Sequence, residues 1–93
     1  MPITPETTVT RNDDLMIAEI DGEVVLMHVD KGNYYGLDQI GSDIWERMAG
    51  PVSVADLHAA LVADYEGDAE EIRADLMELL ERMAEHDLVR VAA

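Results

Sequence analysis

The sequence lacks cysteine in all of its 93 residues. This absence excludes disulfide bonds, thiolate metal ligands and cysteine nucleophiles, and it is typical of an intracellular protein. The N-terminus, Met-Pro-Ile-Thr-Pro-Glu, has neither basic residues nor an apolar run, so it is not a signal peptide. No apolar stretch approaches the ~20 residues that a membrane helix needs. We therefore expect a cytoplasmic protein without a membrane partner.

Basic residues are scarce as well. Only 6 Lys and Arg stand against 21 Asp and Glu, which gives a formal net charge of −15. A nucleic-acid interface must neutralise phosphates with basic side chains, so we expect no nucleic-acid partner. The same charge favours a neutral or basic peptide as a partner. Because 48% of the residues are apolar, the chain can still form the core of one small domain.

The first forty residues have the pattern of strands and turns. Residues 1–8 contain two prolines and several threonines, and we expect them to form a flexible N-terminal arm before a domain of residues 9–93. Within that domain Val9–Arg11 is expected to pair weakly with the sheet. Three strands are predicted, at Leu15–Ile20, Glu23–Val29 and Asn33–Leu37, with a hairpin turn at Asp21-Gly22.

Beyond residue 37 the apolar period changes to that of helices. The first helix begins at Asp38 as its N-cap, the second begins at Ser53, and the third covers about residues 69–85. A short strand over Leu88–Val91 closes the chain. The predicted fold is thus α+β, with an N-terminal three-stranded antiparallel sheet followed by three helices. On the first helix one apolar face is predicted to pack inward, and it consists of Ile40, Ile44, Trp45 and Met48. We expect Trp45 and Met48 to lie in the core, packed beside Tyr35 and Leu37 of the third strand.

The third strand and the third helix together suggest a peptide-binding site. Asn33–Leu37 closes the meander, lies at its edge and carries neither Pro nor charge, the usual devices against pairing with another chain. Such an edge beside an apolar helix face is typical of strand addition. The candidate peptide-binding residues are Asn33, Tyr34, Tyr35, Gly36 and Leu37 on the strand, and Ile72, Arg73, Leu76, Met77 and Leu80 on the helix.

The apolar stripe of the third helix is wider than packing requires. Met77 widens the stripe on the side of Leu80, where Arg73 also lies. The excess width fits either coverage of the sheet or the wall of a groove, and the sequence leaves both open. The opposite flank, around Asp75 and Leu79, is the alternative groove wall.

No catalytic or metal-binding constellation is recognisable. His28, His58 and His86 lie far apart without a ligand spacing. Asp30-Lys-Gly-Asn33 lacks the acidic twelfth position of a calcium loop. Gly41-Ser42-Asp43-Ile44 is similar to the attachment site of acyl carrier proteins, but its acid follows the serine, so a structural turn is expected. We therefore expect no metal, no cofactor and no enzymatic activity.

The segment Lys31–Met48 has a distinctive order of residue types. It reads Lys-Gly-Asn-Tyr-Tyr-Gly-Leu-Asp-Gln-Ile-Gly-Ser-Asp-Ile-Trp-Glu-Arg-Met, with an aromatic-x-Leu-Asp strand end, a glycine, and Ile-Trp on the first helix. Together with the order of strands and helices, it resembles the PqqD-like proteins. These are also called recognition elements for RiPPs, the ribosomally synthesised and post-translationally modified peptides. The resemblance covers about residues 9 to 92.

This resemblance implies a permuted winged helix-turn-helix domain that binds the leader segment of a precursor peptide. The leader would add a strand beside the third strand, and the domain would deliver the precursor to a leader peptidase and to a cyclase of the same pathway. Strand Glu23–Val29 lacks the Trp and the Tyr-Pro ending of the pyrroloquinoline quinone branch. The resemblance is therefore to the stand-alone lasso peptide type. A peptide chaperone of quinone biosynthesis is the alternative, and a winged-helix transcriptional regulator is a weaker one because the third helix is acidic.

Overall fold

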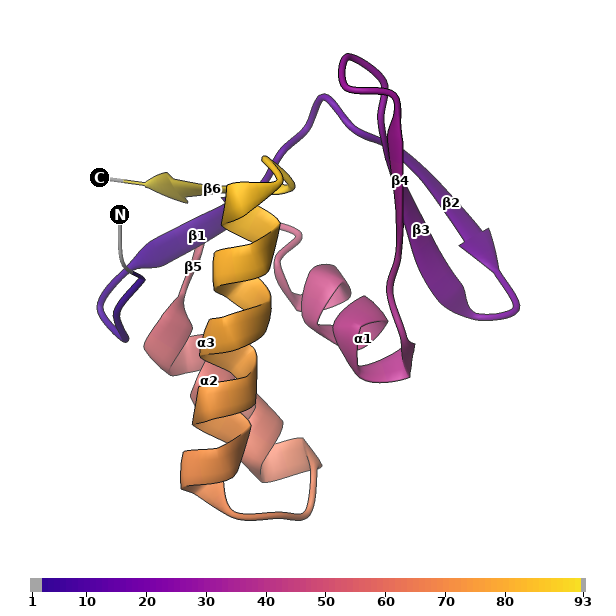
Figure 1. The fold of residues 1–93 in the computed structure, drawn as a ribbon. Coiled ribbons are helices and arrows are strands. Elements are labelled where there is room, and N and C mark those ends of the chain that lie inside the picture. Colours follow the sequence, from indigo (N-terminus) through magenta and orange to yellow (C-terminus); the bar gives the residue numbers. More distant parts are fainter. Residues whose placement is uncertain (1–2, 93) are drawn as a thin grey trace.

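The computed structural model describes residues 3–92. These residues form two small sheets and three helices, and the chain passes from strands to helices and back to a strand (Figure 1). In chain order the elements are β1 (Thr8–Arg11), β2 (Met16–Ile20), β3 (Glu23–His28), β4 (Asn33–Gly36), α1 (Gln39–Arg47), β5 (Val52–Ser53), α2 (Val54–Asp64), α3 (Ala69–Glu85) and β6 (Val89–Ala92).

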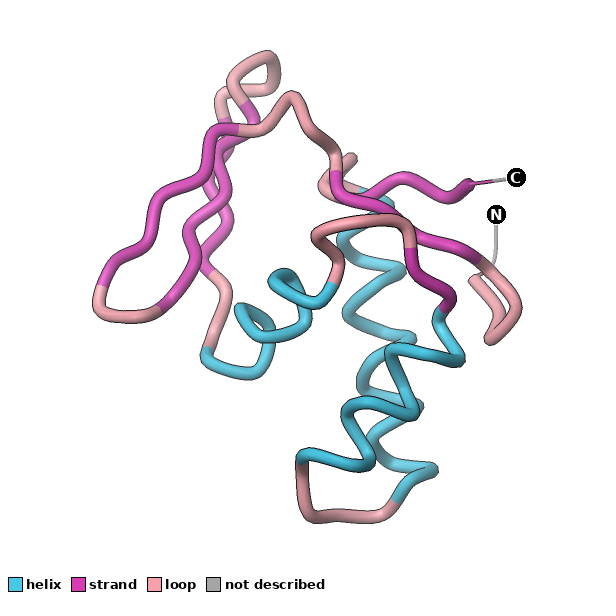
Figure 2. The backbone as a smooth tube through the Cα atoms, turned by 180° about the vertical axis from the view of Figure 1, so that it is seen from behind, coloured by secondary structure: helices cyan, strands magenta, loops and turns pink. Residues whose placement is uncertain are grey.

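Strands β2, β3 and β4 form the predicted antiparallel meander, which we call the N-terminal sheet. The β2–β3 hairpin turns at Asp21 and Gly22, whose φ angles of 54° and 84° are those that a two-residue hairpin requires. β4 lies at one edge, as predicted, because it pairs only with β3 among the described strands. In both Figure 1 and Figure 2 the three helices lie on one side of this sheet.

A second sheet, the terminal sheet, has the order β5-β1-β6. The expectation that Val9–Arg11 pairs with the meander was therefore wrong, since Thr8 lies opposite Ser53 and opposite Ala92. Both partners are remote in sequence, and apolar periodicity does not encode which strands meet. Val9 at the centre of this sheet is fully buried.

The N-terminal segment makes defined contacts from residue 3 onward. Ile3 is buried, and the carbonyl oxygens of Pro5 and Thr7 accept hydrogen bonds from the backbone N–H groups of Ala55 and Val54. Residues 3–8 of the expected arm thus pack where α2 begins, while residues 1 and 2 lie outside the described part of the chain.

The helices begin at side chains that cap free backbone N–H groups. Asp38 accepts a hydrogen bond from Gly41 N, and Ser53 accepts one from Asp56 N, so both predicted N-caps are confirmed. Asp68 caps α3 in the same way. No helix within residues 3–92 combines the length and the apolar character needed to cross a membrane.

The core lies between the N-terminal sheet, the helices and the terminal sheet. Trp45 and Met48 are buried there, as predicted, together with Leu26 of β3. Ile40 is exposed, which contradicts its predicted place on the inner face of the first helix. Ile40 belongs to the first turn of α1, which borders an open cleft instead of the sheet.

Candidate functional site

The free edge of β4 presents backbone groups at alternate residues. Leu37 N donates to Val24 O at 2.9 Å, so this pair of opposed residues is hydrogen-bonded. Bonded and non-bonded pairs alternate along an antiparallel ladder. Tyr35 and Asn33 therefore direct their N–H and C=O groups toward β3, whereas Tyr34 and Gly36 direct theirs toward the open edge.

Ser42 extends the β3–β4 pairing by one step. Its hydroxyl accepts a hydrogen bond from Val24 N at 2.9 Å and donates one to Leu37 O at 3.3 Å. The serine thus bridges two backbone groups that would otherwise bond to each other directly. This buried role confirms the structural reading of the Gly41-Ser42-Asp43-Ile44 segment.

A cleft of about 510 Å³ opens where β4 leads into α1. It lies between the first turns of α1, the end of α2 and the N-terminal half of α3. Its apolar lining consists of Ile40, Ile44, Leu61, Ile72, Leu76 and Leu79, together with the ring of Tyr65. Its acidic lining consists of Asp38, Glu66, Asp68, Glu71 and Asp75.

The acidic lining has two parts. Asp38 and Asp68 are N-caps, and their carboxylates are engaged by backbone N–H groups. Glu66, Glu71 and Asp75 take part in none of the ion pairs among residues 3–92. The cleft therefore combines an apolar lining with carboxylates that are free to bind a positive charge.

The structure brings some of the predicted site residues together and separates others. Asn33–Gly36 form the edge strand, and Leu37 follows it into the core. Ile72 and Leu76 line the cleft. The other predicted helix residues do not: Arg73 pairs with Glu70, while Met77 packs against the core and Leu80 is fully buried.

The cleft wall on α3 is the flank that the sequence had left as the alternative. Asp75 and Leu79 line it, beside Ile72 and Leu76. Sequence reasoning missed Ile40 and Tyr65, which contribute from α1 and from the end of α2. The sequence does contain a sign of both residues. Each is an apolar or aromatic residue close to a helix end, where packing is incomplete.

Tyr65 joins the end of α2 to α1. Its hydroxyl donates to Asp43 Oδ2 at 2.5 Å, and this hydrogen bond to a carboxylate raises the pKa of the phenol. Arg47 bonds to the same aspartate at 3.2 Å and also to Asp64. These contacts connect α1, which carries Ile44, to the end of α2, which carries Leu61. They therefore fix the positions of two residues that line the cleft.

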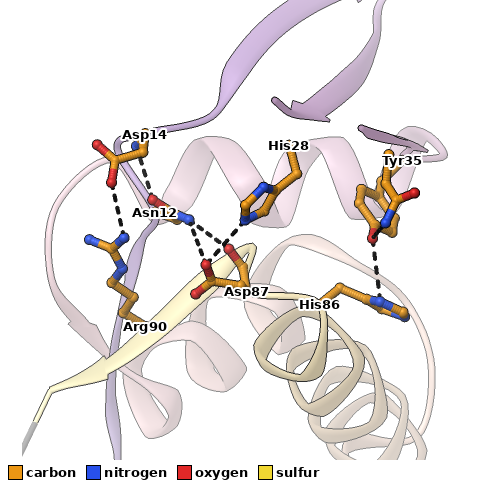
Figure 3. Close-up of polar contacts among 8 residues, drawn as sticks. Asn12, Asp14, His28, Tyr35, His86, Asp87 and Arg90 are labelled. Carbon is orange, nitrogen blue, oxygen red and sulfur yellow. Dashed lines mark hydrogen bonds and ion pairs between the residues drawn. The ribbon is translucent and has the colours of Figure 1, made fainter. Parts of the chain in front are cut away.

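The N-terminal sheet touches α3 near the C-terminal end of that helix (Figure 3). The Tyr35 hydroxyl lies 3.4 Å from His86 Nδ1, and the two rings stack at a tilt with centroids 5.1 Å apart. His28 Nε2 lies 3.1 Å from Asp87 Oδ2, and this hydrogen bond lowers the pKa of Asp87. β4 is therefore anchored beside the end of α3, while the cleft opens along the first half of the helix.

Asn12 completes this junction between the two sheets. Its Nδ2 donates to the backbone oxygen of Asp87 at 2.7 Å, and its Oδ1 accepts from Asp14 N at 2.9 Å. Arg90 on β6 in turn pairs with Asp14 (Figure 3). No group of three or more metal-ligating side chains occurs within the described residues, His28 and Asp87 included.

Comparison with known proteins bears on this arrangement. The profile of the family described as coenzyme PQQ synthesis protein D (PqqD) matches residues 23–89, which is most of the chain. The chain belongs to the PqqD family. Its matched region runs from β3 to the start of β6 and includes both the free edge and the cleft. No curated protein matches the sequence.

Two solved structures are similar to this one over nearly their whole length. The structure described as TbiB1 in complex with the TbiA(beta) leader peptide is 33% identical, with a TM-score of 0.81, and the match covers 90% of this chain and 98% of that chain. The lasso peptide synthetase B1 complexed with the leader peptide is 22% identical, with a TM-score of 0.77 and coverages of 88% and 96%. The second likeness establishes the fold alone.

These findings confirm the resemblance inferred from Lys31–Met48 and the predicted α+β fold. Proteins of the PqqD type are non-catalytic leader-binding proteins, so the prediction that the chain is not an enzyme is confirmed by its family.

Proposed function

We propose that this PqqD-family domain binds the leader segment of a ribosomally synthesised precursor peptide by strand addition to β4. The observation that carries the proposal is the orientation of the edge: Tyr34 and Gly36 present their backbone groups outward. A leader strand bonds to these groups without disturbing the β3–β4 ladder. Main-chain bonds of this kind give affinity for an extended peptide of almost any sequence.

The β4 edge fits this role better than the β2 edge at the other side of the sheet. β2 carries the charged Glu19, a feature that opposes pairing with a further strand. β4 carries no charge, and Asp38, which follows it two residues after its end, lines the cleft. A peptide on β4 therefore reaches an apolar pocket.

The cleft supplies sequence preference. An apolar leader side chain fits among Ile40, Ile72 and Leu79, where it is removed from water. A basic leader residue next to that anchor would meet Glu71 and Asp75. We propose this pair of features, an apolar anchor with a basic neighbour, as the recognition pattern of the cleft.

The proposed biological role is that of a cytoplasmic carrier in a lasso peptide pathway. The domain would hold the precursor for a leader peptidase and then for a cyclase, and it would require no cofactor. The likeness to TbiB1, which was solved with a leader peptide, supports leader binding, and the lasso assignment rests on the resemblance carried by Lys31–Met48 and on strand residues 23–29. A peptide chaperone of pyrroloquinoline quinone synthesis is the second candidate, supported by the name of the matching family.

The test is binding of the purified domain to synthetic leaders taken from precursor genes in its genomic neighbourhood. We expect saturable binding of one leader, much weaker binding of its scrambled sequence, and no cleavage until the neighbouring peptidase is added. A quinone precursor is the discriminating competitor. Tighter binding of that precursor would assign the chaperone role, and binding of neither peptide would refute leader recognition.

A further inference from the structure

A hollow of about 440 Å³, here called the notch, lies between the β2–β3 turn and the passage from β4 into α1. Its apolar lining includes Ile20, Val25 and Leu37. Gly36 borders it at the free edge of the sheet, and nothing lies within 4 Å of the position that a Cβ of this glycine would take. The notch is therefore an open space beside the backbone groups that Gly36 directs outward.

The notch and the cleft lie on two sides of the same junction. Asp38, between β4 and α1, lines both of them. Gly36 lies opposite Val25, whereas the next opposed pair, Tyr35 and Leu26, points toward the helices, where Leu26 is fully buried. The notch thus borders the side of Gly36 that points away from the helices, and the cleft lies on the side of the helices.

Two carboxylates of the notch are free to bind a positive charge. Asp21 lies in the β2–β3 turn and Glu23 is the first residue of β3. Both are exposed, and neither takes part in an ion pair within residues 3–92. Asp38 differs from them, because its carboxylate accepts a hydrogen bond from Gly41 N at 2.7 Å.

A peptide strand on β4 would direct one side chain into the notch. Opposed residues on adjacent strands direct their side chains to the same face of a sheet. The leader residue that pairs with Gly36 therefore points toward the notch, and its two neighbours in the leader point toward the helices. A long basic side chain fits this position, since its methylene stem covers the apolar lining while its charged end reaches Asp21 and Glu23.

We propose that the notch binds an arginine or lysine of the leader, at the residue that pairs with Gly36. The inference rests on the proposed strand addition at β4 and adds a second specificity position to it. An acidic leader residue at this place is repelled by Asp21 and Glu23, and a short one leaves the notch empty. The domain thus recognises alternate leader residues on opposite sides of β4.

The experiment measures the coupling between Glu23 and single positions of a leader. The probe is a synthetic leader from a precursor gene in the genomic neighbourhood that binds the wild-type domain. Each of its residues is replaced in turn by Arg and by Met, which has a similar length but no charge. Affinities for wild type and for Glu23→Gln are measured by fluorescence anisotropy at about 50 mM salt, where exposed charges are weakly screened.

A control variant separates the notch from the net charge of the protein. Glu19→Gln removes one negative charge from the neighbouring strand, but Glu19 lies opposite the buried Val24 and so on the other face of the sheet. Asp21→Asn is a second notch variant and leaves the turn intact, since Asn tolerates the left-handed conformation of this residue. Thermal melts check that each variant is folded.

We expect one leader position at which wild type prefers Arg to Met by about two- to fivefold, as for a solvent-accessible ion pair. Glu23→Gln and Asp21→Asn should each reduce this preference, and Glu19→Gln should keep it. The positions directly before and after it should show no preference that depends on Glu23, because their side chains lie on the other face of the sheet.

Three results overturn the inference while leaving leader recognition standing. The first is equal binding of the Arg and Met peptides at every position. The second is a preference that Glu19→Gln lowers as much as Glu23→Gln does. The third is dependence on Glu23 at two adjacent positions. Failure of wild type to bind any leader would instead refute the proposed function itself.

Discussion

The two sheets of this small domain are built in opposite ways. The N-terminal sheet is a meander of consecutive strands, and among the described residues it leaves both edge strands, β2 and β4, unpaired on their outer side and one face open to solvent. The terminal sheet joins β1 to β5 and β6 from distant parts of the chain, and its central Val9 is fully buried. The terminal sheet thus pairs the first and the last strand of the domain, β1 and β6. The meander instead has backbone groups on its β4 edge that can pair with a peptide.

This contrast implies that binding and stability can be separated by position. Changes at the open edge of the meander should weaken peptide binding with little loss of stability. Changes where the meander joins the terminal sheet and α3 should lower the free energy of unfolding with little effect on binding.

Gly36→Pro should weaken leader binding by about 1–3 kcal/mol, or roughly 5- to 150-fold. Proline removes an N–H that points outward, so a leader carbonyl loses its partner. Gly36→Ala is the control, because it adds a methyl group in open space and keeps the N–H. Anisotropy titrations and thermal melts measure both proteins. A folded proline variant with unchanged affinity would exclude this edge as the site.

Asn12→Ala should lower the free energy of unfolding by about 1–3 kcal/mol, since it leaves Asp87 O and Asp14 N without their buried partner. Leader affinity should stay within about twofold. Urea denaturation provides the measurement, with Asp14→Ala as the control, because that change removes only a surface ion pair worth about 0–1 kcal/mol. Equal stability of wild type and Asn12→Ala would show that the junction does not support the fold.

Leu79→Ala should weaken leader binding by about 1 kcal/mol, or roughly fivefold, because the cleft loses part of its apolar wall. Met77→Ala on the other flank of α3 is the matched change. It should leave affinity nearly unchanged, because Met77 packs against the core and does not line the cleft. The reverse order of effects would place the leader on the flank of Arg73 and Met77.

The smallest expected effect is on the pH dependence of stability. His28 lowers the pKa of Asp87 below its ordinary value of 3.8 in the folded state. The resulting stabilisation is present above about pH 3.8 and is lost as the pH falls through the lower folded pKa. Urea midpoints from pH 6 to pH 3 should therefore decline less steeply for Asp87→Asn. Identical profiles would show that the His28 contact contributes nothing to stability.

The sequence by itself determined the features that depend on neighbouring residues. The Asp21-Gly22 turn, the caps at Asp38 and Ser53 and the extent of α3 were all predictable. The hydrogen bonds of a turn or a helix cap join groups that are only a few residues apart, so the local sequence determines whether they form. The edge position of Asn33–Gly36 followed as well, because a meander places its last strand at an edge.

Only the tertiary structure decided which surfaces meet. The sequence gives α3 two apolar flanks, and the approach of α1 and α2 decides that Leu79, not Met77, lines the cleft. Elements remote in the chain likewise decide three other features: the pairing of β1 with β6, the exposure of Ile40 and the outward direction of Gly36 N–H. Burial and strand pairing are properties of assembled neighbours, and periodicity within one element cannot specify them.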